Sequence, residues 1–138
     1  MSRRFAQTSA QGAAAEAFLK PRLERFLGEP LEEQDRFARL DFKGATTGFH
    51  EVKSRAPCYK SDDKYAEKGW FIGVPKIAAA LCCAEPVTFW YYFLSDSTLW
   101  KLPFDPDLFS QFKPFVNAQG QETIAIPKKF WTQVLLDV

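Results

Sequence analysis

The sequence of 138 residues has almost no net charge, because 18 Lys and Arg residues stand against 17 Asp and Glu residues. A formal net charge of +1 gives no support to a strong, diffuse electrostatic attraction to nucleic acid. Any nucleic-acid binding must therefore depend on local clusters of basic side chains. The sequence also shows no internal repeat, low-complexity stretch or domain linker.

The sequence is equally poor in the features of zinc-binding, disulfide-bonded, secreted and membrane proteins. Its three cysteines, Cys58, Cys82 and Cys83, lack C-x-x-C or Cys/His ligand spacing and do not make a disulfide framework. The N-terminus has no apolar signal-peptide core, and apolar runs such as residues 77–84 are too short to span a bilayer. We therefore expect a cytoplasmic protein (in the host-cell cytoplasm if it is viral), with no membrane partner and no organic cofactor.

What the sequence does contain indicates one globular domain over residues 1–138, since 46% of the residues are apolar and 16% aromatic. Hydrophobic periodicity and turn signals predict an α/β or α+β fold, a central mixed sheet flanked by helices. Pro21 is expected to kink or divide the first helix, which Thr8 or Ser9 can cap. The expected elements are a helix over 9–27, a polar linker over 29–34, strands over 36–42 and 49–54 around a turn at 43–48, a polar loop over 55–69, a strand or helix start at 70–74, a helix over 75–84, strands over 87–94 and 98–102, a helix over 105–112, a strand over 122–126 and helical turns over 127–134.

The strand–turn–strand over residues 39–55 carries the candidate site. Glu51 and Lys53 lie two residues apart, so that on a strand they share one face, while His50 and Val52 point to the other face. If the hairpin pairs Asp41 opposite Glu51, both carboxylates and the lysine project from the same side. Two carboxylates beside a lysine are the minimal set for a divalent-metal site that hydrolyses a phosphodiester. The alternative is an exposed hairpin in which the same side chains form ordinary surface ion pairs.

Glu16 is a further candidate, because it falls on the same helical stripe as Leu19, Leu23 and Leu27. An unpaired carboxylate among core-facing leucines is costly, which would suit a role in a site. The alternative, equally open from the sequence, is that Glu16 lies at the edge of the stripe and reaches solvent.

This order of Glu16 on a helix, Asp41 at a strand end and Glu51-Val52-Lys53 on the next strand resembles the PD-(D/E)XK nuclease superfamily, with its restriction-endonuclease-like fold. Residues 51–55 are similar to the corresponding strand of Holliday-junction resolvases. The resemblance covers roughly residues 10–94, within an expected core of about 9–103, and leaves 104–138 as a C-terminal extension. Leu40 stands at the position of the proline in the PD-(D/E)XK motif, and that proline takes no part in the chemistry.

The resemblance implies a Mg²⁺- or Mn²⁺-dependent deoxyribonuclease acting on DNA, with branched or otherwise structured DNA as a candidate substrate. It implies that Asp41, Glu51 and Glu16 hold the metal and that Lys53 assists the attacking water. A catalytically inactive DNA-binding or protein-interaction module with the same fold is the alternative. A small domain that cuts both strands needs two sites, so we expect a homodimer. The candidate DNA-backbone contacts are Arg3, Arg4, Arg55, Lys60, Lys64, Lys68 and Lys76.

Overall fold

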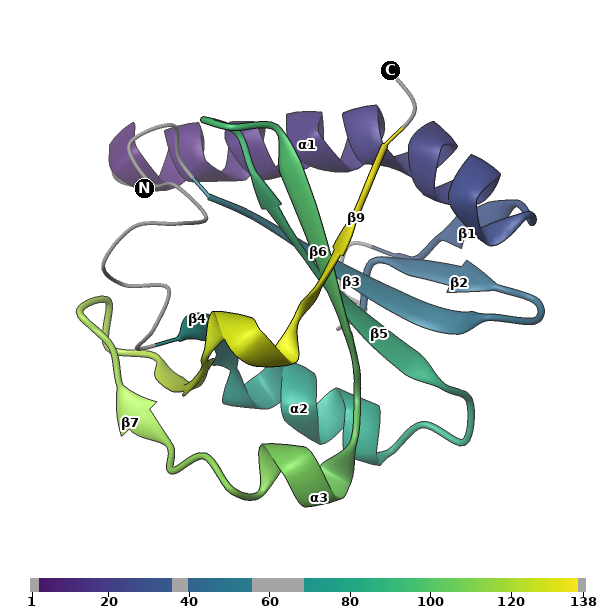
Figure 1. The fold of residues 1–138 in the computed structure, drawn as a ribbon. Coiled ribbons are helices and arrows are strands. Elements are labelled where there is room, and N and C mark those ends of the chain that lie inside the picture. The colour runs from purple at the N-terminus through teal and green to yellow at the C-terminus, as the bar shows by residue number, and fades with distance from the viewer. Residues whose placement is uncertain (1–2, 36–39, 56–68, 137–138) are drawn as a thin grey trace.

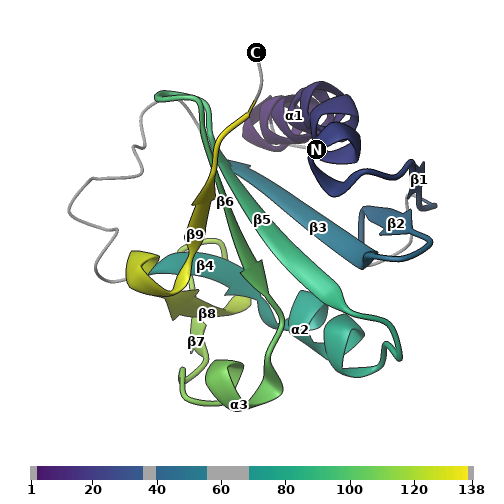
Figure 2. The same ribbon diagram turned by 45° about the vertical axis from the view of Figure 1, so that its right-hand side comes forward.

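The computed structural model describes residues 3–35, 40–55 and 69–136, and shows one α+β domain in three layers (Figures 1 and 2). Helix α1 covers one face of a six-stranded mixed sheet, while a three-stranded antiparallel sheet and helices α2 and α3 lie on its other side. The elements are α1 (Arg3–Leu27), β1 (Leu31–Glu33), β2 (Phe42–Gly44), β3 (Gly48–Arg55), β4 (Trp70–Gly73), α2 (Val74–Leu81), β5 (Val87–Phe93), β6 (Thr98–Pro103), α3 (Pro106–Phe109), β7 (Phe115–Val116), β8 (Glu122–Ile126), a 3₁₀ turn (Lys128–Phe130) and β9 (Thr132–Val134).

The large sheet has the order β1-β2-β3-β5-β6-β9, and the small sheet has the order β4-β8-β7. Strands β3 and β5 pair in parallel, which requires the intervening chain to cross over the sheet, and β4 and α2 lie in that crossover. The remaining strand pairs are antiparallel, including the predicted β2–β3 and β5–β6 hairpins. The mixed sheet with helices on its faces therefore confirms the coarse fold prediction.

Helix α1 is held to the sheet by one apolar stripe. Leu19 and Leu23 are fully buried and pack in a cluster with Trp90 and Tyr92 of β5. Burying a leucine side chain contributes about 1.5–3 kcal/mol, so this stripe is a strong anchor for the helix. Helix α1 begins at Arg3, well before the predicted cap, and Pro21 does not divide it.

The opposite face of the large sheet packs on the second layer. Alternate residues of β5, such as Phe89 and Tyr91, join a core cluster with Trp70 of β4 and Trp131, which follows the 3₁₀ turn. The aromatic run of β5 is thus core on both faces, as its sequence predicts. Residues 104–136 contribute to both sheets, because β7 and β8 lie in the small sheet and β9 forms an edge of the large sheet.

Three short strands were not predicted, and their lengths explain why. Strand β1 lies in the predicted polar linker, β7 has two residues, and β9 replaces the second half of the predicted helical turns over 127–134. The hairpin strand predicted over 36–42 was also wrong in its bounds, since β2 begins at Phe42; residues 36–39 lie outside the described residues. Segments of two or three residues take their strand conformation from a partner, and so have no period of their own.

Candidate active site

Asp41 is held beside β3 by a hydrogen bond to the backbone. Its Oδ2 accepts a hydrogen bond from the Val52 N–H at 2.8 Å, immediately beyond the last pair of β2 and β3. Phe42 pairs with His50, and one further step of this register sets Asp41 against Glu51. Asp41 itself precedes β2, and its side chain meets Glu51 through a hydrogen bond between the two carboxyl groups.

Glu51 is not a surface residue, since only 7% of it is exposed. Burial, followed by the hydrogen bond and negative charge of Asp41, raises the pKa of Glu51 from 4.5 to about 9. Lys76 Nζ lies 2.8 Å from Glu51 Oε2 and opposes this rise. Desolvation and the charge of Asp41 together outweigh the effect of the half-exposed Lys76 ammonium, so the pKa of Glu51 is raised. The alternative of ordinary surface pairs does not describe this buried carboxyl group.

Glu16 reaches the same group from α1. Desolvation and the negative charge of Asp41 raise the pKa of Glu16 from 4.5 to about 7, and a side-chain hydrogen bond with Asp41 adds to the rise. The positive charge of Lys76 lowers the pKa of Glu16, and the negative charge of Glu33 raises it. Asp41 is thus the shared neighbour of Glu16 and Glu51, and the structure brings together the three carboxylates that the sequence singled out.

Lys53 lies one strand repeat beyond Glu51 on the same face of β3. Desolvation by the surrounding protein, together with the positive charge of Arg55, lowers the pKa of Lys53 from 10.5 although its side chain remains exposed. The positive charge of Lys76 lowers it further, and Glu51 raises it. A lysine with a lowered pKa gives up its proton more readily than an ordinary surface lysine.

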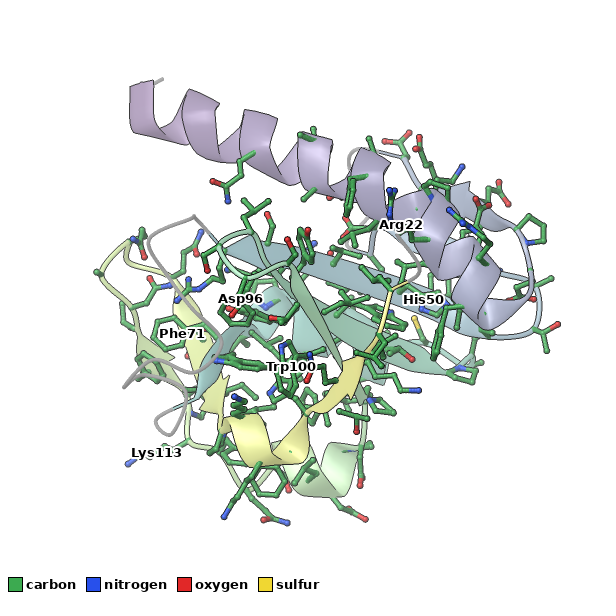
Figure 3. All side chains as sticks on the ribbon, turned by 45° about the horizontal axis from the view of Figure 1, so that its top comes forward. Arg22, His50, Phe71, Asp96, Trp100 and Lys113 are labelled. Carbon is green, nitrogen blue, oxygen red and sulfur yellow. The ribbon has the colours of Figure 1, made fainter. Side chains whose placement is uncertain are left out.

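The other face of β3 fixes the strand by a chain of side-chain hydrogen bonds. Trp90 Nε1 donates to His50 Nδ1 at 3.0 Å, so His50 Nε2 carries the proton of the neutral ring and faces Thr47 Oγ1 at 2.8 Å. Thr47 Oγ1 in turn donates to Glu29 Oε2 at 2.6 Å. Burial lowers the pKa of His50 from 6.5 to about 4, which keeps the ring neutral. His50, labelled in Figure 3, therefore supports the strand from the face opposite to Glu51.

Glu29 and Thr47 were missed by the sequence analysis. Glu29 also accepts hydrogen bonds from the backbone N–H groups of Thr46 and Thr47 and so ties the β2–β3 turn to the end of α1. The only sequence signal was the run Gly44-Ala-Thr-Thr-Gly48, which marks a turn but names no partner 18 residues away.

A cavity of about 980 Å³ opens beside the carboxylates and lysines. Glu51, Lys53 and Lys76 line one part of it, and mostly apolar side chains from β4, α2 and β5 line the rest. A volume of this size is within the range of ligand-binding sites. The charged side chains therefore adjoin a space large enough for part of a substrate.

The proposed DNA contacts have different outcomes. Arg55 lies over the ring of Phe71, with its guanidinium carbon 5.7 Å from the ring centre, close to Lys53 along β3. Lys76 contacts Glu51 and lines the cavity. Lys60, Lys64 and Lys68 lie outside the described residues, and the side chains of Arg3 and Arg4 are not described.

The residues present suit a hard divalent cation by their chemistry. The buried Glu51 Oε2 lies 2.8 Å from the Lys76 ammonium, so a cation that binds this oxygen would replace that ion pair. Oxygen ligands of this kind are those that Mg²⁺ and Mn²⁺ take. Within the described ranges, however, no three His, Cys, Asp or Glu side chains are already arranged around a common ion position. A metal would therefore require the carboxylates to turn toward it.

Comparison with protein-family models, with curated proteins and with solved structures gave no match for this chain. Fold and site thus define the molecule as a single α+β domain with a carboxylate–lysine cluster beside a cavity. In the part of the chain that the structure describes, no helix is both long and apolar enough to span a membrane.

Proposed function

We propose that this protein is a metal-dependent DNA endonuclease with a restriction-endonuclease-like fold. The observation that carries the proposal is the grouping of Asp41 and Glu51 around β3, with Lys53 and Lys76 beside them. An α-helix, a hairpin and a parallel crossover containing α2 supply these residues in the order found in the PD-(D/E)XK superfamily. Carboxylates brought this close are costly to folding, and a bound cation removes that cost.

Asp41, Glu51 and Glu16 would hold the metal ion, which would stabilise the negative charge that develops on the phosphate during hydrolysis. Lys53 acts beside them in two ways. Its ammonium form offsets phosphate charge, and its neutral form can accept a proton from the attacking water at Nζ. The new P–O bond forms from that water while the bond to the leaving oxygen breaks, and a proton returns to the leaving oxygen. Lys76 adds a second positive charge at the phosphate.

Nicking of supercoiled and branched DNA with Mg²⁺ or Mn²⁺ tests the proposal. Glu51→Ala and Lys53→Ala should each lower the rate at least about 100-fold, since each removes a group that acts in the transition state. Glu32→Ala and Lys113→Ala change an exposed acid and an exposed lysine away from the site and should leave the rate unchanged. Cleavage that survives in both Glu51→Ala and Lys53→Ala would contradict the assignment.

One observation favours the alternative, an inactive module that binds DNA or protein. Lys76 already supplies a positive charge at Glu51, as a metal ion would. On this alternative, the ion pair is permanent and divalent ions do not bind. Binding of Mn²⁺ that is lost in Asp41→Ala and Glu51→Ala would rule it out.

A further inference from the structure

The cavity beside the carboxylates is lined by both charged and apolar side chains. Lys53 and Lys76 stand at its charged part, where a phosphate group would be attracted. Phe71 and Ile72 of β4 and Ala79 of α2 are among its apolar lining residues. Phosphate on one side and a flat apolar group on the other is the chemical pattern of a nucleotide.

Phe71 offers an aromatic ring to this space. The side chain is half-buried, and the ring of Phe115 contacts it edge-on at 5.3 Å between centres. Arg55 lies on the same ring at 5.7 Å. These neighbours hold the Phe71 ring in place near Lys53, and Figure 3 labels it on β4. Aromatic rings with nearby arginines are the surfaces on which unpaired bases stack.

We infer that the cavity binds an unpaired nucleobase, which stacks on Phe71 while the phosphate of the same strand lies against Lys53 and Lys76. This inference rests on the proposed function and narrows its substrate class to nucleic acid that is single-stranded or locally unpaired. A base inside a duplex is stacked and paired, and entering the cavity would cost that stacking. Gln121 and Glu122, at the start of β8, line the same cavity and can form hydrogen bonds with the edge of the base.

The charge of the chain agrees with this inference. With a formal net charge of +1, the protein has no strong, diffuse electrostatic attraction for phosphates. Base stacking supplies affinity without added charge and acts on every base type. Binding should therefore depend less on salt than it does for a strongly basic nuclease.

The test uses short oligonucleotides with one 2-aminopurine, either unpaired in a bulge or paired in the matching duplex. Binding is measured by fluorescence with Ca²⁺, an oxygen-binding ion, in place of Mg²⁺. The bulged probe should bind at least about tenfold more tightly than the duplex, and its fluorescence should change as the base stacks. Phe71→Ala should weaken binding of the bulged probe about tenfold.

Two further variants make the result specific. Phe71→Leu keeps an apolar side chain but loses the aromatic face, so it should behave like Phe71→Ala even if the alanine variant folds poorly. Phe18→Ala removes a phenylalanine that is 41% exposed on α1 and packs on Tyr92, which does not line the cavity, so this variant should bind as the wild type does. Circular dichroism and thermal melting confirm that each variant is folded.

The outcomes separate this inference from the proposed function. Equal binding of both probes, or a fluorescence change that persists in Phe71→Leu, overturns the base pocket. Cleavage of bulged DNA at the wild-type rate by Phe71→Leu overturns it too, and leaves the nuclease proposal intact. Selective binding of the bulged probe without cleavage of any DNA would instead support the base pocket and contradict the nuclease proposal.

Discussion

At the scale of single residues, Glu51 is the group whose burial is hardest to explain by folding alone. The residue is 7% exposed, and burial, followed by the neighbouring Asp41, raises the pKa of its carboxyl group to about 9. An apolar side chain of similar size would avoid both the desolvation and the repulsion. Groups that lower stability in this way are typical of functional sites.

We predict that the metal-free protein becomes less stable as the pH rises. The folded-state pKa of Glu51 lies above its unfolded value of 4.5, so the folded protein holds an extra proton between pH 4.5 and about 9. Stability is therefore greatest below pH 4.5 as far as this group is concerned, and decreases as the pH rises through that window. Glu51→Gln should remove this contribution and be more stable than the wild type at pH 8.5, by about 1 kcal/mol or more.

Urea unfolding at pH 5.5 and pH 8.5 with EDTA measures the effect. Glu32→Gln removes a carboxylate from an exposed position of β1 and serves as the matched control. A Glu51→Gln variant with the pH dependence of the wild type would show that the buried carboxyl group does not hold the proton.

At the scale of elements, the β2–β3 hairpin is the scaffold of the site. Gly48, with a φ of +85°, lets Phe49 N–H donate to Pro86 O at 2.8 Å, and a Cβ at Gly48 would overlap that oxygen. Gly44 leaves room in the same way for the Glu29 carboxylate. The turn is thus tied to the end of α1 and to the start of β5. These contacts fix the position of β3, and with it the positions of Glu51 and Lys53.

We predict that Glu29 stabilises the hairpin in a pH-dependent way. Hydrogen bonds from Thr47, then from Thr46, lower the pKa of Glu29 from 4.5 to about 2. A lowered carboxyl pKa gives stability that is fully present above pH 4.5 and is lost as the pH falls toward 2. Glu29→Gln should therefore unfold at a lower temperature than the wild type at pH 7, and the difference should shrink below pH 4.

Thermal unfolding followed by circular dichroism between pH 7 and pH 2.5 checks this prediction. Glu122→Gln, at an exposed position of β8, is the control for loss of one negative charge. If the melting temperatures of Glu29→Gln and the wild type coincide at pH 7, the hydrogen bonds of Glu29 do not stabilise the turn.

At the scale of the whole molecule, the site lies where separate elements meet. Helix α1 brings Glu16 from one side of the large sheet, α2 brings Lys76 from the other, and β3 lies between them. The cavity extends from this meeting point toward the small sheet. The carboxylate–lysine cluster and the cavity therefore depend on the packing of all three layers.

The sequence predicts those parts of this arrangement that have a local signal. The periodicity of Leu19 and Leu23 predicts α1, and the two-residue spacing of Glu51 and Lys53, which both lie on β3, predicts their shared face. The pairing of His50 with Trp90 spans 40 residues, and the ion pair of Lys76 with Glu51 joins two elements, so neither leaves a local pattern. Burial of Glu51 and the cavity likewise follow from packing, which no short stretch of sequence encodes.

Calorimetric titration with Mn²⁺ tests the central claim, a carboxylate centre that binds a divalent ion, most directly. We expect wild-type protein to bind Mn²⁺ more tightly as the pH rises from 6.5 to 8.5 and to release protons, because the raised pKa values of Glu16 and Glu51 make the ion compete with protons. Asp41→Ala and Glu51→Ala should lose this binding, while Glu32→Ala keeps it. Absence of binding in the wild type, or equal binding in Glu51→Ala, would contradict the claim.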